Sequence, residues 1–286
     1  MGTYAKIILD SEFKGTRVTT FELSYPRIIH GEFMTHRVFS RNASSSRAVP
    51  VKKRAQELRN NPFVPTVWRL NQAGMQPKNE PAGALKSAFA ASVWGAHRYF
   101  SIASMWLLSK AGIAKELSNR LGEAHEYIKV VLTATEFDNF WELRDHQDAQ
   151  FEIRLLAMMM REAYDKSVPI TRNHGDWHLP FVTEQDIQEY EAHYLPKISA
   201  ARCARVSYNL HSGERPSLEK DLDLYHSLIH SKPMHASPVE HQVYFDGALI
   251  RKTPGVSHLD RNNNLWSGNF KNCVQLRKLI EQGEFA

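Results

Sequence analysis

Cysteine is scarce in this sequence: Cys203 and Cys273 are the two thiols among 286 residues. Two cysteines cannot build the disulfide framework of a small secreted domain, and they fit a reducing compartment. No Cys-x-x-Cys pair is present to indicate a zinc site. We therefore expect a cytoplasmic protein that carries no metal.

Long apolar runs are also missing. No stretch approaches the ~20 consecutive apolar residues that span a bilayer. The first residues, Met1 to Lys6, do not open the hydrophobic region of a signal peptide. With 42% hydrophobic and 23% charged residues, the composition is typical of a soluble globular protein. These absences predict no membrane partner.

The charge balance is mildly basic, with 36 Lys and Arg against 31 Asp and Glu and a net charge of +5. Such a balance favours anionic ligands. The basic residues do not gather into a dense stripe, and no nucleic-acid-binding motif is recognisable. We expect small anionic ligands, such as nucleotides, and no nucleic-acid partner.

The segment from Thr35 to Arg47 is the most informative part of the chain. It holds three arginines, one histidine, one asparagine and four serines. Arginine offers a planar fork of donors that matches phosphate oxygens, and serine and asparagine add short neutral donors. A solvated polar loop would have a similar composition. The segment taken with the rest of the chain predicts an anion site.

The spacing of this segment resembles the signature of the flavin-dependent thymidylate synthases (ThyX). The chain departs from that signature at Thr35, where the family has Arg, and at Ala43, where it has Glu. Glu32 stands where the family commonly has Gln. The matching positions are His36, Arg37, Ser40, Asn42, Ser45 and Arg47.

Three further segments resemble the same family, namely 139–153, 204–208 and 235–241. In the usual family the last two come first, so the order predicts a circular permutation, which chains tolerate where termini lie close together at the surface. The resemblance covers about 17–50, 84–166 and 198–245. We expect a single domain over 1–286, in which 198–245 resembles the family's N-terminal part and the tail 247–286 is unexplained.

Periodicity predicts the secondary structure. Helix dominates, which indicates an α+β, ThyX-like fold with a small, mostly antiparallel sheet. The aromatic stripe on the 84–111 helix is expected to lie in the core. The predicted helices are 27–39, 51–60, 84–111, 148–166, 184–194, 218–231 and 270–281, and the predicted strands are 17–23, 128–135 and 242–245.

The resemblance implies methylation of dUMP to dTMP, with FAD as cofactor and methylenetetrahydrofolate and NADPH as co-substrates. Neither Cys203 nor Cys273 lies in the setting of a nucleophile, which argues against a route that attacks the pyrimidine with a thiolate. The cofactor would carry out the difficult chemistry, and the protein would position and polarise the substrate. The family also implies a homotetramer with FAD between subunits.

The resemblance also assigns roles to residues. Arg144 is the expected catalytic group, which stabilises negative charge on the pyrimidine; an ion pair with Glu142 or Asp145 is the structural alternative. The nucleotide would be bound by Glu32, Ser45, Arg47, Arg120 and Arg144, although Asn119 aligns as well as Arg120. The residues expected to line the flavin are His36, Arg37, Ser40, Asn42, Asn139, Ser207, His235, Ser237, Glu240 and His241. For Glu240 and His241, a purely structural role is the alternative.

Two other functions remain open at the level of the sequence. The departures at Thr35 and Ala43 delete a cation and a carboxylate, a pair that can be lost together at little cost. They are also compatible with flavin-dependent hydroxymethylation of dUMP or dCMP, in which water rather than hydride completes the reaction. A catalytically inactive nucleotide- or flavin-binding protein is the third possibility.

Overall fold

A computed structural model describes residues 2–73, 81–206, 216–246, 256–259 and 262–285. Its centre is a five-stranded sheet with the order β3-β4-β2-β1-β5. All neighbours in it are antiparallel except the short pairing of β5 with β1. The strands are β1 (Tyr4–Phe13), β2 (Thr16–Pro26), β3 (Ser40–Ala43), β4 (Tyr127–Ala134) and β5 (Ile170–Thr171).

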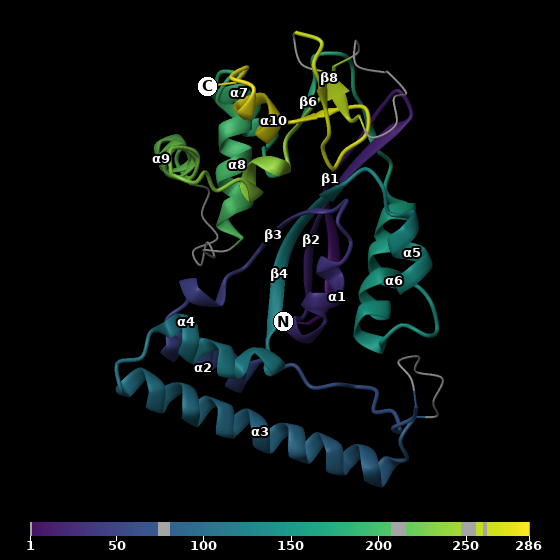
Figure 1. The fold of residues 1–286 in the computed structure, drawn as a ribbon, viewed down its shortest axis with the longest axis vertical. Coiled ribbons are helices and arrows are strands. Elements are labelled where there is room, and N and C mark those ends of the chain that lie inside the picture. Colours follow the sequence, from purple (N-terminus) through teal and green to yellow (C-terminus); the bar gives the residue numbers. More distant parts are fainter. Residues whose placement is uncertain (1, 74–80, 207–215, 247–255, 260–261, 286) are drawn as a thin grey trace.

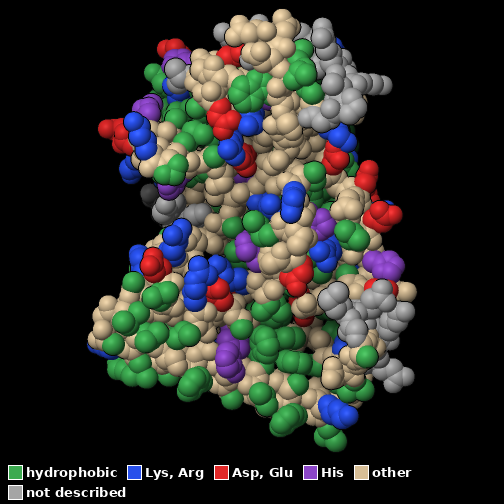
Figure 2. Space-filling model, viewed as in Figure 1, with side chains coloured by type: hydrophobic (Ala, Val, Ile, Leu, Met, Phe, Trp, Pro, Cys, Tyr) green, Lys and Arg blue, Asp and Glu red, His purple; other side chains and the backbone are tan. Residues whose placement is uncertain are grey.

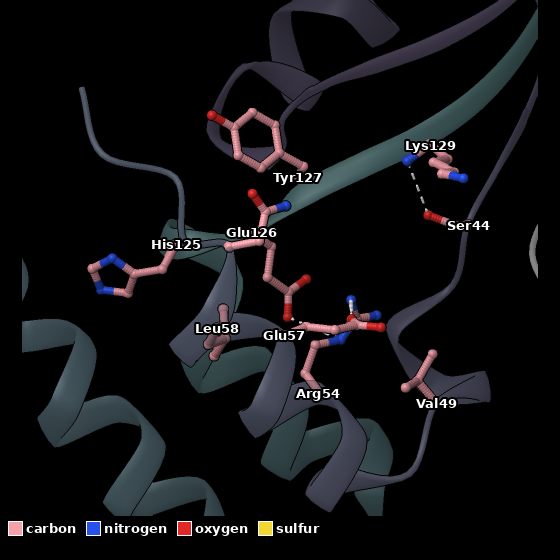
Figure 3. Close-up of a pocket in the computed structure, with 10 residues that line it drawn as sticks. Ser44, Val49, Arg54, Glu57, Leu58, His125, Glu126, Tyr127 and Lys129 are labelled. Atoms are coloured by element: carbon pink, nitrogen blue, oxygen red, sulfur yellow. Dashed lines mark hydrogen bonds and ion pairs between the residues drawn. The ribbon is translucent and has the colours of Figure 1, made fainter. Parts of the chain in front are cut away.

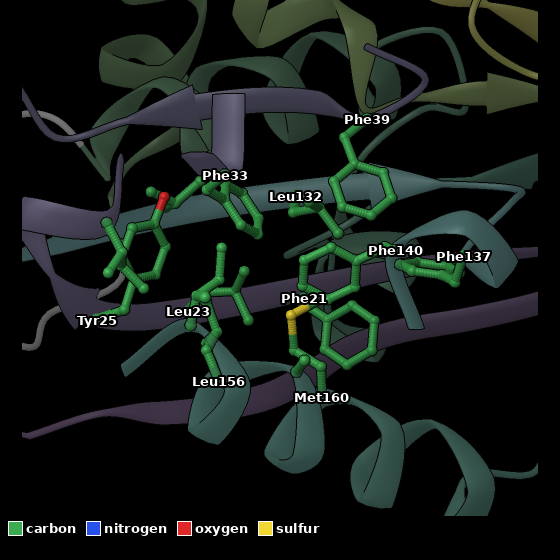
Figure 4. Close-up of a cluster of buried hydrophobic side chains, with 14 of the residues drawn as sticks. Phe21, Leu23, Tyr25, Phe33, Phe39, Leu132, Phe137, Phe140, Leu156 and Met160 are labelled. Carbon is green, nitrogen blue, oxygen red and sulfur yellow. The ribbon is translucent and has the colours of Figure 1, made fainter. Parts of the chain in front are cut away.

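The main core lies where α5 (Asp138–Arg144) and α6 (Phe151–Lys166) cover one face of this sheet (Figure 1). Phenylalanine rings from three elements meet there (Figure 4). Phe33 contacts Phe39 and Phe140 with ring centroids 5.8 Å apart in each case. Burying rings of this size contributes much of the hydrophobic stabilisation. The core therefore fixes α5 and the segment before β3 against each other.

A helical layer lies at one end of the sheet (Figure 1). It comprises η2 (Ser46–Ala48), α2 (Val51–Asn60), α3 (Ala84–Lys110), α4 (Lys115–Ser118) and the 3₁₀ segment η3 (Asn119–His125). Gly122 allows η3 to approach α2 and α3 closely, because a Cβ there would stand 2.5 Å from Leu58 Cδ1 and 3.0 Å from Met105 Sδ. Gly112, at φ +78°, ends α3 in the left-handed conformation.

The other end of the sheet carries a second layer (Figure 1). Its helices α7 and α8 are tied by Arg202, which reaches Asp186 at 2.6 Å and Asp221 of α9 at 3.0 Å. The elements are β6 (Trp177–His178), α7 (Glu184–Glu189), α8 (Leu195–Arg205), α9 (Leu218–Ile229), η4 (Ser237–Glu240), β7 (Val243–Tyr244), β8 (His258–Leu259), β9 (Leu265–Trp266), β10 (Val274–Gln275) and α10 (Leu276–Glu281).

The α+β class and the helix-rich architecture with antiparallel sheets are confirmed. The helices at 51–60, 84–111 and 148–166 lie where periodicity places them. Three details are wrong. The 27–39 helix is only η1 (Arg27–Ile29) and α1 (His30–Met34), because the chain turns toward β3; α7 ends at Glu189; and the closing helix begins at Leu276, after β10.

The aromatic stripe of α3 is the largest discrepancy. Apart from Ser101, Ile102 and Met105, none of its residues is buried, whereas Leu85 is 89% and Phe89 is 72% exposed. Figure 2 shows apolar side chains spread along this edge of the molecule. Periodicity identified the helix but not what its apolar side chains contact. Among the described residues, no helix is long and apolar enough to cross a membrane.

Candidate functional site

The signature segment comprises residues 35–47, and its residues 40–43 form β3, a four-residue strand at the edge of the sheet. Strand alternation sends its side chains to opposite faces. Ser40 and Asn42 are buried and contact the second layer, whereas Arg41 and Ala43 face the main core. Arg41 donates from Nη1 to the Phe33 carbonyl at 3.1 Å. Alternate residues of this short strand therefore contact the second layer and the main core.

Asn42 joins β3 to segments far along the chain. Its Nδ2 donates to the Cys203 carbonyl at 2.7 Å, and its Oδ1 accepts from Ser237 Oγ at 3.3 Å. The structure thus brings 198–245 into contact with the signature strand, although Asn42 and Ser237 are 195 residues apart. Ser207, the other expected flavin contact of this region, lies outside the described residues.

An open cleft of about 470 Å³ lies beside these contacts. Arg47 is exposed there, and its guanidinium makes no hydrogen bond or ion pair with any residue that the structure describes. Such a cation suits an anionic ligand. Apolar walls come from Ala48, Leu228 and Pro238. The other lining residues are Asn42, Ala43, Ser45, Glu116, Ala204, His235 and Ser237.

Arg144 lies apart from that cleft, at the end of α5. Its Nε donates to His36 Nε2 at 3.0 Å, and its Nη2 donates to Thr35 Oγ1 at 3.3 Å and to the Glu32 carbonyl at 3.5 Å. The ion pair with Glu142 or Asp145, which is the structural alternative for Arg144, is not among its contacts with the described residues; Asp145 pairs with Arg161. Arg144 is therefore held by the signature segment.

His36 is a neutral acceptor for Arg144. Burial, together with the nearby cations Arg144 and Arg41, lowers its pKa to about 4, and a hydrogen bond with Asn139 acts in the opposite direction. Because Nε2 accepts from Arg144, the ring proton is on Nδ1. A neutral imidazole here orients the guanidinium without neutralising its charge. His36, Asn139 and Arg144 thus form one group.

The remaining predicted site residues are placed as follows. Arg37 is exposed, and Arg120 is exposed with an ion pair to Glu123 at 3.2 Å. Asn119, the alternative to Arg120, is buried and donates to the Ser46 and Val49 carbonyls at 2.8 and 2.9 Å. Ser40, Glu240 and His241 are engaged by protein groups, namely Gln275, Arg277 and Thr133.

His241 ends a line of buried hydrogen bonds that crosses the sheet. Its Nδ1 lies 2.9 Å from Thr133 Oγ1, which lies 2.7 Å from Thr20 Oγ1. The line continues to His178 at 2.8 Å, to Ser11 at 2.9 Å and to Arg172, whose Nε donates to Ser11 at 3.1 Å. Burial lowers the pKa of His241 to about 3, so the ring is neutral.

A second pocket lies behind the signature segment, lined by Ser44, Val49, Arg54 and the ends of η3 and β4 (Figure 3). Glu126 is almost fully buried in it, with Arg54 Nε 3.1 Å away and Arg27 Nη1 3.8 Å away. Burial raises the pKa of Glu126 to about 7, although the two arginines act in the opposite direction. The ion cluster of Arg27, Arg54 and Glu126 therefore lies beside Ser44 and Val49, which flank Ser45 and Arg47 in the sequence.

Sequence reasoning missed Glu116, Glu126 and Gln275. Their neighbours in the sequence carry no motif, and each reaches the site only through tertiary packing. Among the described residues, no group of three or more His, Cys, Asp or Glu side chains is arranged to hold a metal ion.

The fold and the site combine an antiparallel sheet with a cleft that holds an exposed arginine, and comparison with known proteins identifies the family. The profile of the family described as thymidylate synthase complementing protein (Thy1, or ThyX) matches residues 16–170, more than half of the chain. The chain belongs to this family. The match runs from β2 to β5 and includes the signature strand and Arg144.

Two crystal structures of a UMP/dUMP methylase, PolB from Streptomyces cacaoi, resemble part of the fold. The complex with 5-Br dUMP aligns with a TM-score of 0.44 and 22% identity over 52% of this chain and 67% of that chain. The complex with 5-Br UMP aligns with a TM-score of 0.47 and 17% identity over 57% of this chain and 89% of that chain. No curated protein matches the sequence significantly.

The burial of Glu126 generates a prediction about pH. Its pKa is raised in the folded state, so the protonated form favours folding below about 4.5 and this contribution is lost as pH rises through about 7. Glu126→Gln removes the titration. Denaturant unfolding from pH 5 to 8 should therefore show the variant gaining stability relative to wild type, by an amount on the order of 3 kcal/mol. Glu162→Gln, at an exposed ion pair on α6, should show no such trend. Parallel curves of unfolding free energy against pH for wild type and Glu126→Gln would contradict the prediction.

Proposed function

We propose that this protein methylates dUMP to dTMP, with FAD as cofactor, methylenetetrahydrofolate as one-carbon donor and NADPH as reductant. The observation that carries the proposal is the family match over the segment that holds both Arg47 and Arg144. The positions of these arginines support it, because one opens into a cleft and the other is held by the signature segment.

The cleft residues fit a ligand that combines phosphates with a flat ring system. Arg47 and Ser45 offer a cation and a hydroxyl, Asn42, His235 and Ser237 offer polar groups, and Leu228 and Pro238 offer apolar walls. Ser45 and Arg47 would bind the nucleotide phosphate, and Asn42, His235 and Ser237 would contact the flavin. The flavin, when bound, supplies the hydride that completes the methyl group.

Arg144 would stabilise the negative charge that develops on the pyrimidine. The guanidinium keeps its proton, and His36, Thr35 and the Glu32 carbonyl fix its Nε and Nη2. Its Nη1 makes no hydrogen bond with a described residue and is the donor left for a ligand. A preorganised donor of this kind lowers the barrier because it needs no reorientation during the reaction.

Hydroxymethylation of dUMP or dCMP is the second candidate, and Thr35 is the observation that favours it. At this position the family has a cation, whereas here a hydroxyl accepts from Arg144. The cation of the family is therefore missing beside Arg144, and the family carboxylate at Ala43 is missing as well. A protein that binds nucleotide or flavin without turnover is the third candidate.

Product analysis tests the proposal. Purified protein incubated with dUMP, methylenetetrahydrofolate and NADPH should give dTMP, identified by mass spectrometry. A hydroxymethyl product, from dUMP or from dCMP, would favour the second candidate. Bound flavin that NADPH never turns over with either nucleotide would favour the third.

Two arginine variants separate binding from chemistry. Arg47→Ala should raise KM for dUMP more than it lowers kcat, because its contact with the phosphate is the same in ground and transition states. Arg144→Ala should lower kcat by about a hundredfold or more. Arg161→Ala, at an exposed ion pair beside α5, is the matched control. Normal turnover by Arg144→Ala would contradict the role of Arg144 in pyrimidine activation and would leave it a structural role only.

We also infer a single domain in which 198–245 takes the place of the family's N-terminal part. The contacts of Asn42 with Cys203 and Ser237, and of Thr133 with His241, support this circular permutation. They pack the late segment on the strands that the family profile covers.

The exposed face of α3 supports a homotetramer. Leu85, Phe89 and Phe100 are all more than 70% exposed on one 27-residue helix. Apolar surface of this extent marks an interaction site. A second copy of the chain is the partner that the family implies, with FAD sites built between subunits.

Charging this face should dissociate the assembly. Phe89→Glu combined with Phe100→Glu should convert the tetramer to smaller species in light scattering, because two buried charges in an apolar interface cost several kcal/mol. Val168→Glu places one such charge at an apolar position off α3 that is 88% exposed, and it should leave the mass unchanged. A wild-type monomer with full FAD occupancy would contradict the proposal.

A further inference from the structure

The C-terminal part of the chain lies outside the family match and outside every segment that resembles the family. Its described residues nevertheless approach the signature strand. β10 pairs with β7, and the Leu276 amide donates to the Gln242 carbonyl at 3.0 Å. This pairing places Gln275 between β3 and the turn η4, two elements that border the cleft.

Gln275 contacts both elements with one amide group. Its Nε2 donates to Ser40 Oγ at 2.9 Å and to the Glu240 carbonyl at 2.7 Å. The side chain is only 5% exposed, so water cannot replace these bonds easily. A buried amide that holds two segments 200 residues apart fixes their separation.

Arg277 adds a second tie to the same turn. Its Nη1 pairs with Glu240 and its Nε with Glu281 of α10 at 2.7 Å. Asn269 Nδ2 also donates to Ser40 Oγ, at 3.3 Å. The tail therefore contacts Ser40 twice and Glu240 at both its carbonyl and its carboxylate.

The strand needs such support because of its position. β3 has four residues and a partner on one side only, β4. Short edge strands have few ladder hydrogen bonds and open easily. Asn42, two residues after Ser40, lines the cleft and binds Ser237. A shift of β3 relative to η4 would therefore change the shape of the cleft.

We propose that Gln275, assisted by Arg277, is a positioning residue of the cleft, which sets the distance between the signature strand and the Ser237–Glu240 turn. This inference rests on the proposed function only for the identity of the ligand, because the contacts themselves are made without one. The role of the tail is then to hold in place two segments that the chain order separates.

Gln275→Met tests the proposal, since methionine keeps the length of the side chain and removes both donors. Gln282→Met is the control: Gln282 is a half-buried glutamine of the tail, whose Nε2 contacts His258 rather than the cleft. Hydrogen exchange of the unliganded full chain and calorimetric titration with dUMP are the two measurements. We expect faster exchange in 40–43 and 237–242 and a Kd for dUMP raised about tenfold, the effect of one lost contact, in Gln275→Met alone.

Unchanged exchange in these two segments would overturn the proposal, and so would faster exchange with an unchanged Kd. If wild type binds no dUMP, the proposed function fails while the exchange result still decides whether Gln275 holds the two segments. Arg277→Met is the second variant in case Gln275→Met does not fold. It should raise exchange in 237–242 and leave 40–43 near wild type, because Arg277 contacts Glu240 in the first segment and its other partner, Glu281, lies on α10. Equal effects on both segments, or none, would count against the proposal.

Discussion

The four-residue ladder between β3 and β4 is the constraint on which both parts of the candidate site depend. Its register pairs Ser40 with Thr133 and Ala43 with Val130. Because successive side chains point to opposite faces, the ladder directs Asn42 toward the cleft and Arg41 toward the core that carries α1 and α5. A slip of one residue would exchange these faces and remove both sets of contacts.

The ladder also explains why the residues that resemble a single motif do not form a single surface. His36 precedes the strand and lies with Arg144, whereas Ser45 and Arg47 follow it and line the cleft. Residues that are close in the signature sequence therefore lie in two different environments of the structure. What joins them is the backbone of β3, together with the ion cluster of Arg27, Arg54 and Glu126 behind it.

Much of the fold could be predicted from local pattern. The helices α2, α3 and α6 have strong periodicity. Periodicity predicts neither the strand β3 nor the helix α5, because each is short and carries motif residues rather than a clear apolar period. The exposure of α3 could not be predicted, because an apolar face has the same periodicity whether it packs in a core or against another chain. The roles of Gln275 and Glu126 could not be predicted for a different reason. Each role depends on a tertiary neighbour, and neither the residue type nor the spacing in the sequence indicates which neighbour that is.

The buried line from Arg172 to His241 has a consequence for the direction of its hydrogen bonds. Arginine is a permanent donor, so Arg172 occupies one lone pair of Ser11. When Ser11 donates to His178, His178 carries its proton on Nε2 and donates to Thr20, which donates to Thr133, which donates to His241 Nδ1. When His178 instead donates from Nδ1 to Ser11, each of these bonds reverses and His241 donates from Nδ1. The tautomers of the two buried imidazoles are therefore coupled through two threonine hydroxyls, and the proton of one ring follows that of the other across the sheet.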